Sequence, residues 1–278
     1  MTVRDDVPPW IFHWNPRKPV FPGRLGRLIP LRRRVNNFGD LLGPRIVRLL
    51  MQQRGAVDLG LEAPRRLFSV GSVLHFAADD DIVWGSGVNG KVSQSSLGFE
   101  RLDVRAVRGP RTAAILRDKG IAVPEVYGDP ALLLRDLDQD FAGWSLDKRH
   151  KITIVPNLND LSTLGRTADV LDPRGRVDDC LERIARSEVV VASSLHGIIL
   201  GELAGAKVVP FRATREHIFK YDDYYEGTGR ARPEFAPDLD SALDLAAGAA
   251  SVSDPLENWD ARPLLDAFPW DALTTGRE

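Results

Sequence analysis

The chain has 278 residues, and its 37 Lys and Arg nearly balance its 39 Asp and Glu, for a formal net charge of −2. A hydrophobic content of 43% with 27% charged residues is typical of globular proteins and excludes a disordered chain. The single cysteine excludes a disulfide scaffold and a cysteine-based zinc site, and it favours a reducing compartment.

The charge is unevenly distributed along the chain. Residues 1–66 contain thirteen basic and five acidic side chains, and no acid occurs between Val7 and Gly39. The opening segment is also rich in Pro, Gly and Trp, so we predict that residues 1–35 form a basic arm, extended or folded into an ordered loop. The chain opens without the apolar stretch of a secretory signal, and its most apolar segment, Val189–Phe211, is interrupted by polar residues. We therefore expect a cytoplasmic protein.

Residues 36–140 alternate between helix and strand patterns. Apolar residues at helical spacing follow Asp40 and predict a helix that ends near Gly55. Pro110–Lys119 is a second predicted helix, because proline is favoured in a first helical turn. Short apolar runs that end in Gly or Ser turns predict buried strands at 67–72, 81–87 and 103–109.

The second half repeats this alternation after residues 135–149, whose lack of periodicity predicts a linker. Strands alternating with helices of this length predict parallel α/β sheets. We therefore predict two Rossmann-like domains, 36–140 and 150–278, with a cleft at the carboxyl ends of the strands and the last helices packing back on the first domain. The later strand patterns lie at 151–157, 188–194 and 207–212, and the helix patterns at 176–187 and 195–206.

The segment ASSLHGIIL (192–200) is a candidate anion site. It ends a β-branched strand at Ser193 and Ser194 and places His196 at the start of the next helix. Backbone N–H groups and the positive end of a helix dipole favour a phosphate or carboxylate at such a turn. A histidine there can donate or accept a proton in a reaction, and the alternative is a histidine that only caps the turn.

The segment AVRGPRTAAIL (106–116) has the same arrangement in the first half. Arg108 follows a predicted strand, and Arg111 lies in the first turn of the predicted helix. A guanidinium group matches a carboxylate or phosphate with two parallel hydrogen bonds. The alternative for either residue is a solvated arginine at a surface turn.

Three further segments carry polar side chains suited to binding. FKYDDYYEGTGR (219–230) mixes aromatic and hydrogen-bonding groups of the kind that hold sugars, with a partly exposed helix as the alternative. GSGVNG in the turn at 85–91 lacks the full dinucleotide fingerprint, and the chain has no Walker A sequence. The five histidines lack metal-site spacing, so we expect no metal. The glycine-rich turns at 36–40 and 85–91 contain Asn37, Asp40, Asn89 and Lys91.

Taken together and in order, these segments resemble the polysaccharide pyruvyl transferase family, in particular its exopolysaccharide ketal-pyruvate branch. The resemblance implies a GT-B-like fold, in which two Rossmann-type domains with parallel sheets face a central cleft. It also implies transfer of the enolpyruvyl unit of phosphoenolpyruvate (PEP) to two hydroxyls of one sugar in a polysaccharide repeat unit, with release of phosphate and without a metal or cofactor. The resembling segments run from about Asn36 to Gly229 and read NNFGDLLGP, IVWGSGVNGK, AVRGPRT, YGDPALLL, SSLHGIILGELAG and FKYDDYYEGTG.

The resemblance also assigns roles to single residues. The family's Ser-x-Leu-His motif matches His196, the expected general acid, and its Val-Arg segment matches Arg108, an expected PEP ligand. The aspartate of its Asp-Pro-Ala segment matches Asp129, for which bracing a turn is a sufficient role. Many members carry arginine where this chain has Ser194, so another cation must take its place. The expected PEP ligands are Arg108, Arg111, Ser193, Ser194, Lys91, Arg212 and Lys220, and the expected acceptor-binding residues are Asn37, Asp40, Asn89, His217, Tyr221 and Asp222.

Two other functions fit the same sequence. A GT-B-type glycosyltransferase would bind a nucleotide sugar and show no response to PEP. A non-catalytic carbohydrate-binding protein would bind saccharide without turnover.

The basic arm allows two interpretations as well. It has no nucleic-acid motif, so we do not expect a nucleic-acid partner. With Trp10, Trp14 and Phe21 it could contact an anionic membrane, or the diphosphate of a lipid-linked acceptor at the inner membrane face. The alternative is that its arginines pair with the acidic remainder of the chain.

Overall fold

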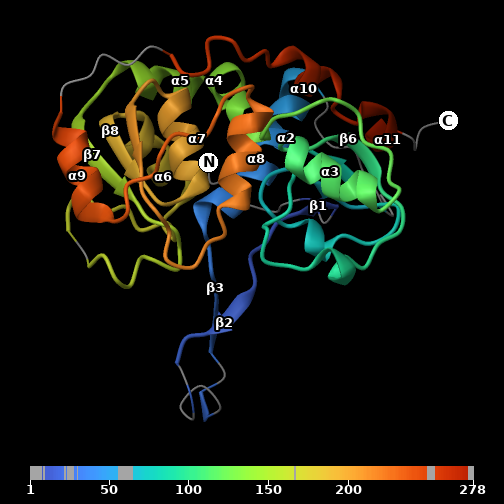
Figure 1. Cartoon of the computed structure of the whole chain (residues 1–278), viewed down its shortest axis with the longest axis horizontal. Coiled ribbons are helices and arrows are strands. Elements are labelled where there is room, and N and C mark those ends of the chain that lie inside the picture. Colours follow the sequence, from blue (N-terminus) through green and yellow to red (C-terminus); the bar gives the residue numbers. More distant parts are fainter. Residues whose placement is uncertain are drawn as a thin grey trace.

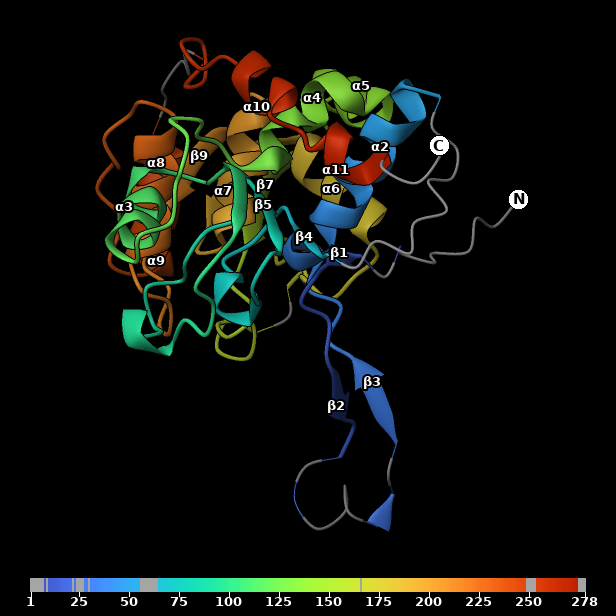
Figure 2. The same ribbon diagram turned by 90° about the vertical axis from the view of Figure 1, so that its right-hand side faces the viewer.

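The computed structural model describes residues 10–21, 31–55, 65–165, 167–248 and 254–274, together with positions 8, 23, 28 and 29. Two parallel sheets lie on opposite sides of a central group of helices, and a narrow hairpin projects from the body (Figures 1 and 2). The predicted α/β class with parallel sheets is therefore confirmed. The GT-B-like pairing of two domains stays a prediction.

The first sheet has the strand order β1-β4-β5-β6, and all its neighbours are parallel. The strands are shorter than predicted because glycines turn the chain early: Gly71 and Gly85 adopt φ values of 104° and 87°, which favour glycine. The edge strand β1 comes from the segment predicted as an arm. The strands are β1 (Ile11–Phe12), β4 (Leu67–Phe68), β5 (Ile82–Trp84) and β6 (Asp103–Ala106).

The second sheet has the order β7-β8-β9 and is also parallel. The β-branched run of β8 pairs on both sides, which explains its almost continuous apolar sequence. Helices α6 and α7 contribute to a core shared with the first sheet, whereas α9 packs in a separate cluster with Val191 and Val209. The elements are β7 (His150–Val155), β8 (Ser187–Ala192), β9 (Lys207–Pro210), α6 (Val177–Ala185), α7 (Leu195–Leu203) and α9 (Leu239–Ala247).

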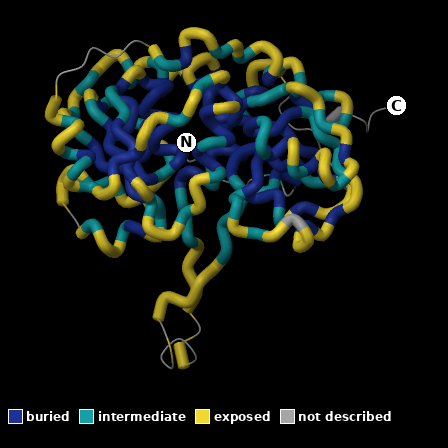
Figure 3. Tube along the Cα trace, viewed as in Figure 1, coloured by how far each residue is buried: buried dark blue, intermediate teal, exposed yellow. Residues whose placement is uncertain are grey.

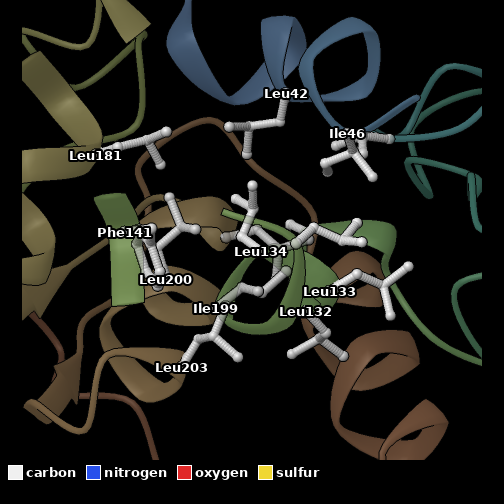
Figure 4. Close-up of a cluster of buried hydrophobic side chains, with 14 of the residues drawn as sticks. Leu42, Ile46, Leu132, Leu133, Leu134, Phe141, Leu181, Ile199, Leu200 and Leu203 are labelled. Atoms are coloured by element: carbon white, nitrogen blue, oxygen red, sulfur yellow. The ribbon is translucent and has the colours of Figure 1, made fainter. Parts of the chain in front are cut away.

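One continuous hydrophobic cluster contains residues from both sheets and from the helices between them (Figure 4). Leu42 and Ile46 of α2 (Leu42–Gln53) enter it from one side, and Leu181 of α6 and Leu200 of α7 enter it from the other. The two sheets are therefore held on a common core. Its middle is formed by η4 (Pro130–Leu133), α4 (Leu134–Leu137) and α5 (Gln139–Leu146).

Residues 135–149, predicted as an aperiodic linker, instead contain most of α4 and all of α5. Asp138 caps α5 by accepting hydrogen bonds from the N–H groups of Asp140 and Phe141, each at 3.2 Å. Its second carboxylate oxygen lies 2.6 Å from the guanidinium of Arg45 on α2. Phe141 is the buried residue of α5, so this helix has almost no apolar periodicity for a sequence pattern to detect.

The last helices contact the first sheet. The indole N–H of Trp84 donates to the carbonyl of Leu264 at 2.8 Å, and its ring meets Phe268 edge-on at 4.8 Å between centroids. Arg105 of β6 pairs with Asp271 at 2.8 Å. Helix α8 packs against α3. These helices are α3 (Pro110–Asp118), α8 (Phe219–Gly227), α10 (Arg262–Asp266) and α11 (Trp270–Thr274).

The projecting hairpin consists of the antiparallel strands β2 (Arg17–Pro19) and β3 (Arg32–Arg34). Both strands are exposed along their length, and the hairpin stands apart from the body in two perpendicular views (Figures 1–3). In the part of the chain that the structure describes, no helix is long and apolar enough to cross a membrane.

Candidate active site

A cavity of about 360 Å³ lies at the carboxyl ends of strands from both sheets. Open α/β sheets bind ligands at this edge, since strand-to-helix loops and helix N-termini gather there. The loops after β4, β5, β7, β8 and β9 contribute to its wall, together with η1 (Phe38–Leu41) and the base of the hairpin. Its polar lining consists of Lys18, Asn37, Asp40, Ser72, His75, Asn89, Lys91, Asn157, Asn159, Ser194, His196, Glu216 and Lys220.

His196 lies in the first turn of α7 and is 8% exposed. Its Nε2 is 3.6 Å from the Oδ2 of Asp129, and neither atom has a hydrogen-bond partner among the described residues. Asp129 is fully buried at the start of η4, where its other carboxylate oxygen accepts from the N–H of Ala131 at 3.0 Å. A buried carboxylate oxygen normally has a donor. The His196 ring presents a nitrogen that can serve as that donor.

The other ring nitrogen of His196 faces Gly39. A Cβ on Gly39 would lie 2.3 Å from Nδ1 and 3.0 Å from Cγ of the ring, so a larger residue would displace the histidine. The glycine of the NNFGD segment is thus required by close approach rather than by backbone conformation. The ring is held between Gly39 and Asp129.

Two lysines on the cavity wall share one carboxylate. Glu216 accepts from Lys91 at 2.7 Å through Oε1 and from Lys220 at 2.9 Å through Oε2, and Asn159 also donates to Oε1 at 3.1 Å. Burial lowers the pKa of Lys220. Burial alone would raise the pKa of Glu216, but Lys220 and Lys91 outweigh it and lower that pKa. This group therefore orients the amino groups of two lysines on one carboxylate at the cavity wall.

The turn before α2 adds a second polar group. Asn37 donates to Asp40 at 2.7 Å, and burial raises the pKa of Asp40 against the opposing influence of Asn37 and His196. Across the cavity wall, Asn89 accepts from the backbone N–H of Lys91 at 2.8 Å and leaves its amide nitrogen 3.5 Å from the Nδ1 of His75. Side-chain amides and carboxylates of this kind bind hydroxyl groups.

The strand-to-helix turn after β8 carries Ser194 and His196 at the start of α7. Ser194 caps α7, and its side chain accepts from the N–H of Gly197 at 3.4 Å. Ser193 points away from the cavity: it is fully buried, donates to Asp160 at 2.8 Å and accepts from the N–H of Asn157 at 2.9 Å. Its carbonyl accepts from the Tyr221 hydroxyl at 2.6 Å. Ser193 and Tyr221 thus brace the turn that carries Ser194 and His196.

The structure does not bring Arg108 to the cavity. Its guanidinium is fully buried and donates to Asp223 at 3.0 Å, to the Ser72 hydroxyl at 2.6 Å and to the Val88 carbonyl at 2.8 Å. Asp223 also accepts from the N–H and the hydroxyl of Thr112 at 2.9 Å and 2.7 Å. The sequence suggested a ligand because the residue follows a strand, but these contacts make it an internal link between β6, α3 and α8.

Besides Arg108, Ser193 and Tyr221, four other expected ligands lie outside the cavity wall: Arg111, Arg212, His217 and Asp222. Arg111 pairs with Asp222 at 2.8 Å and with Glu226 at 2.7 Å on the outer face of α8. Arg212 is exposed. His217 is exposed, with its Nδ1 accepting from the N–H of Phe219 at 3.1 Å. The structure does bring together Lys91, Lys220, Ser194, Asn37, Asp40, Asn89 and His196.

Several lining residues were missed by sequence reasoning. Asn157 and Asn159 follow the end of β7, so the strand-end rule could have found them. No sequence pattern around Glu216 marks it as a site residue. Its role depends on Lys91, which is distant in the chain, and on Lys220, which is one helical turn away. Trp14 and Lys18 lie in the segment predicted as an arm and reach the cavity only because the hairpin base folds against it.

No metal cluster emerges from these residues. Within the described ranges, no group of three or more His, Cys, Asp or Glu side chains is placed to hold a metal ion.

Comparisons with known proteins give the family. A family model described as polysaccharide pyruvyl transferase matches residues 65–213, more than half of the chain. The chain is 32% identical over 201 residues to the succinoglycan biosynthesis protein ExoV of Rhizobium meliloti (strain 1021). That alignment covers 66% of this chain and 60% of ExoV, so the chain spans less than two thirds of this relative's length. No solved structure matches the chain. The chain belongs to the polysaccharide pyruvyl transferase family.

Proposed function

We propose that this protein transfers the enolpyruvyl group of PEP to two hydroxyls of one sugar in a polysaccharide repeat unit. The product is a cyclic pyruvate ketal, and phosphate is released. The observation that carries the proposal is the placement of His196, Lys91 and Lys220 on one cavity in a chain of this family.

The donor substrate, PEP, binds through its negatively charged groups. PEP carries a carboxylate and a phosphate, and both need cations or backbone N–H groups. Lys91 and Lys220 supply ammonium groups, and the start of α7 supplies N–H groups and the positive end of its dipole. These lysines take the place of the family arginine that is Ser194 in this chain. Glu216 holds them in position and keeps the empty site from excessive positive charge.

His196 supplies the proton. Its Nε2 faces Asp129 at 3.6 Å, so the carboxylate fixes the orientation of the ring. Nδ1, which lies beside Gly39 at the cavity wall, is then the nitrogen left to deliver the proton. A positioned acid of this kind contributes about 10²–10⁴-fold to the rate.

The reaction balances as follows in bonds and protons. Protonation of the PEP methylene carbon leaves an oxocarbenium-like centre on the adjacent carbon, and one acceptor hydroxyl adds there and loses its proton. The carbon–oxygen bond to phosphate breaks with its electron pair on phosphate. The second hydroxyl then adds to the same carbon and loses its proton. One released proton restores His196, and the other leaves with the phosphate.

The acceptor sugar binds on the remaining polar wall. Asn37, Asp40 and Asn89 offer amide and carboxylate groups, and Asn157 and Asn159 lie on the loop after β7. Orienting two hydroxyls against the bound donor removes much of the entropic barrier of a two-substrate reaction. We place the acceptor on a lipid diphosphate carrier and the enzyme in the cytoplasm, at the inner face of the membrane.

The test is phosphate release from PEP in the presence of a repeat-unit saccharide. His196→Ala should lower kcat by about 10²–10⁴-fold. His150→Ala removes a histidine of β7 outside the cavity and should leave the rate unchanged. Equal rates for wild type and His196→Ala would remove the assigned role of His196. Binding of a nucleotide sugar with no response to PEP would favour the glycosyltransferase alternative.

A further inference from the structure

The two strands of the projecting hairpin hold positively charged side chains opposite one another, which costs stability. We call β2 and β3, together with Val20, Phe21 and Leu31, the basic hairpin. The strand register sets Arg17 opposite Arg34 and Lys18 opposite Arg33. Like charges directly opposite each other destabilise a β-ladder, and a two-stranded hairpin by itself is marginally stable.

The five cations of the two strands are Arg17, Lys18, Arg32, Arg33 and Arg34. Among the described residues, none of them pairs with an Asp or Glu: Lys18 lies 5.5 Å from the ring centre of Trp14, and Arg34 donates to the carbonyl of Asn15 at 3.3 Å. The described acids of the body therefore do not supply the counter-charge that the alternative interpretation requires. An external anionic surface would neutralise these cations.

The same hairpin exposes apolar side chains. The N–H of Val20 donates to the carbonyl of Leu31 at 2.9 Å, so these residues extend the ladder beyond its charged part. Exposed fractions are 42% for Val20, 36% for Phe21, 81% for Leu28, 43% for Ile29 and 57% for Leu31. A nucleic acid backbone would neutralise the cations but presents no aliphatic surface to this apolar end. An anionic bilayer offers phosphates to the cations and an acyl boundary to the apolar side chains.

We propose that the basic hairpin docks on the surface of an anionic lipid bilayer, with its apolar end in the headgroup–acyl boundary and its cations at the phosphates. Trp14 and Lys18 at its base also line the cavity, so docking brings the cavity to the membrane surface. This inference deepens the proposed function by naming the surface at which the acceptor is met. Binding to vesicles needs no catalysis, so the two proposals can fail separately.

The experiment is flotation of the full chain with vesicles of phosphatidylcholine alone or with 30% phosphatidylglycerol (about a third anionic lipid, enough for a surface potential). Two variants test the two halves of the hairpin: a charge variant, Arg32→Gln with Arg33→Gln and Arg34→Gln, and an apolar variant, Val20→Ser with Phe21→Ser and Leu31→Ser. A control removes the same charge from exposed arginines of the body, with Arg149→Gln, Arg176→Gln and Arg262→Gln.

We expect wild type and control to bind the anionic vesicles, and salt to weaken the binding. Each cation removed from the hairpin should weaken binding about fivefold, and the charge variant about 100-fold. The apolar variant should also lose affinity while keeping the charge. Absence of wild-type binding, or an equal loss in the control, would overturn the proposal. Tight RNA binding that the apolar variant retains, with no vesicle binding, would assign the hairpin to nucleic acid instead.

Discussion

The Nε2 of His196 lies 3.6 Å from the Oδ2 of Asp129, and both atoms are buried without a hydrogen-bond partner among the described residues. The two side chains come from different halves of the chain, one at the start of η4 and the other at the start of α7. A small approach of the ring would make a charge-assisted hydrogen bond. The pair therefore links the geometry of the common core to the position of the cavity histidine.

Asp129→Asn tests this link through turnover. Asparagine keeps the volume and the cap to Ala131 but removes the carboxylate oxygen that faces the ring. The His196 ring is then held less well in its reacting position. We expect kcat to fall by about 10–100-fold, since the acid is less well oriented.

Asp238→Asn is the matched control, because Asp238 caps α9 through the N–H of Ser241 and lies outside the cavity. It should leave kcat unchanged. A wild-type kcat in Asp129→Asn would mean that Asp129 acts only as a helix cap.

Gly39→Ala tests whether the position of the His196 ring matters. The added Cβ would meet Nδ1 at 2.3 Å and force the ring to move. A displacement near 1 Å in a reacting group costs about 10²-fold in rate, so kcat should fall by that order while the fold is retained. Gly98→Ala, where an added Cβ meets nothing within 4 Å, should have wild-type kcat. Full activity of Gly39→Ala would mean that the position of the His196 ring does not affect the reaction.

Substitution of Arg108 should destabilise the folded protein strongly and substitution of Arg111 only slightly, although the two residues are three positions apart. Arg108→Met leaves Asp223 buried without its cation, and loss of one partner of a buried pair costs about 3–5 kcal/mol. Arg111→Met breaks an exposed pair with Glu226, for which about 1 kcal/mol or less is expected. Chemical denaturation measures both free energies of unfolding. A stable Arg108→Met protein with a raised KM for PEP would restore Arg108 as a donor ligand.

Glu216→Gln tests the shared carboxylate through stability against pH. The pKa of Glu216 lies below its ordinary value of 4.5, so the ionised form stabilises the folded protein above about pH 4.5, and this contribution is lost as pH falls through the lowered pKa. The variant should be less stable than wild type by about 1–3 kcal/mol at neutral pH, because the negative charge between the two lysines is lost and one of them loses its acceptor. The difference should shrink below pH 4.5. Glu188→Gln, an exposed carboxylate 3.6 Å from Lys151, should show almost no difference at any pH.

The sequence predicted the parallel α/β class well because strands such as β8 are continuous β-branched runs and the turns after them are rich in small residues. It also predicted that His196 would stand at a strand-to-helix turn. It assigned Arg108 to the donor because a strand end identifies an edge of the sheet, whereas the rotamer and the presence of Asp223 decide whether the side chain faces the cavity or the core. Glu216 was missed because its function exists only through tertiary contacts.

The predicted basic arm, residues 1–35, is a second case in which composition could not show the tertiary contacts. Composition identified a basic segment, but only the fold shows that β1 joins the first sheet and that Trp14 and Lys18 line the cavity. The charge pattern left two partners open for the arginines, and the strand register adds only that like charges lie opposite each other.

The measurement that tests the central claim most directly is the mass of a repeat-unit saccharide after incubation with the enzyme and PEP. Pyruvyl transfer predicts a gain equal to one pyruvic acid less one water, in step with phosphate release, absent without PEP and strongly reduced with His196→Ala. An unchanged saccharide mass across an acceptor panel, or a gain of a sugar unit from a nucleotide sugar, would contradict the account.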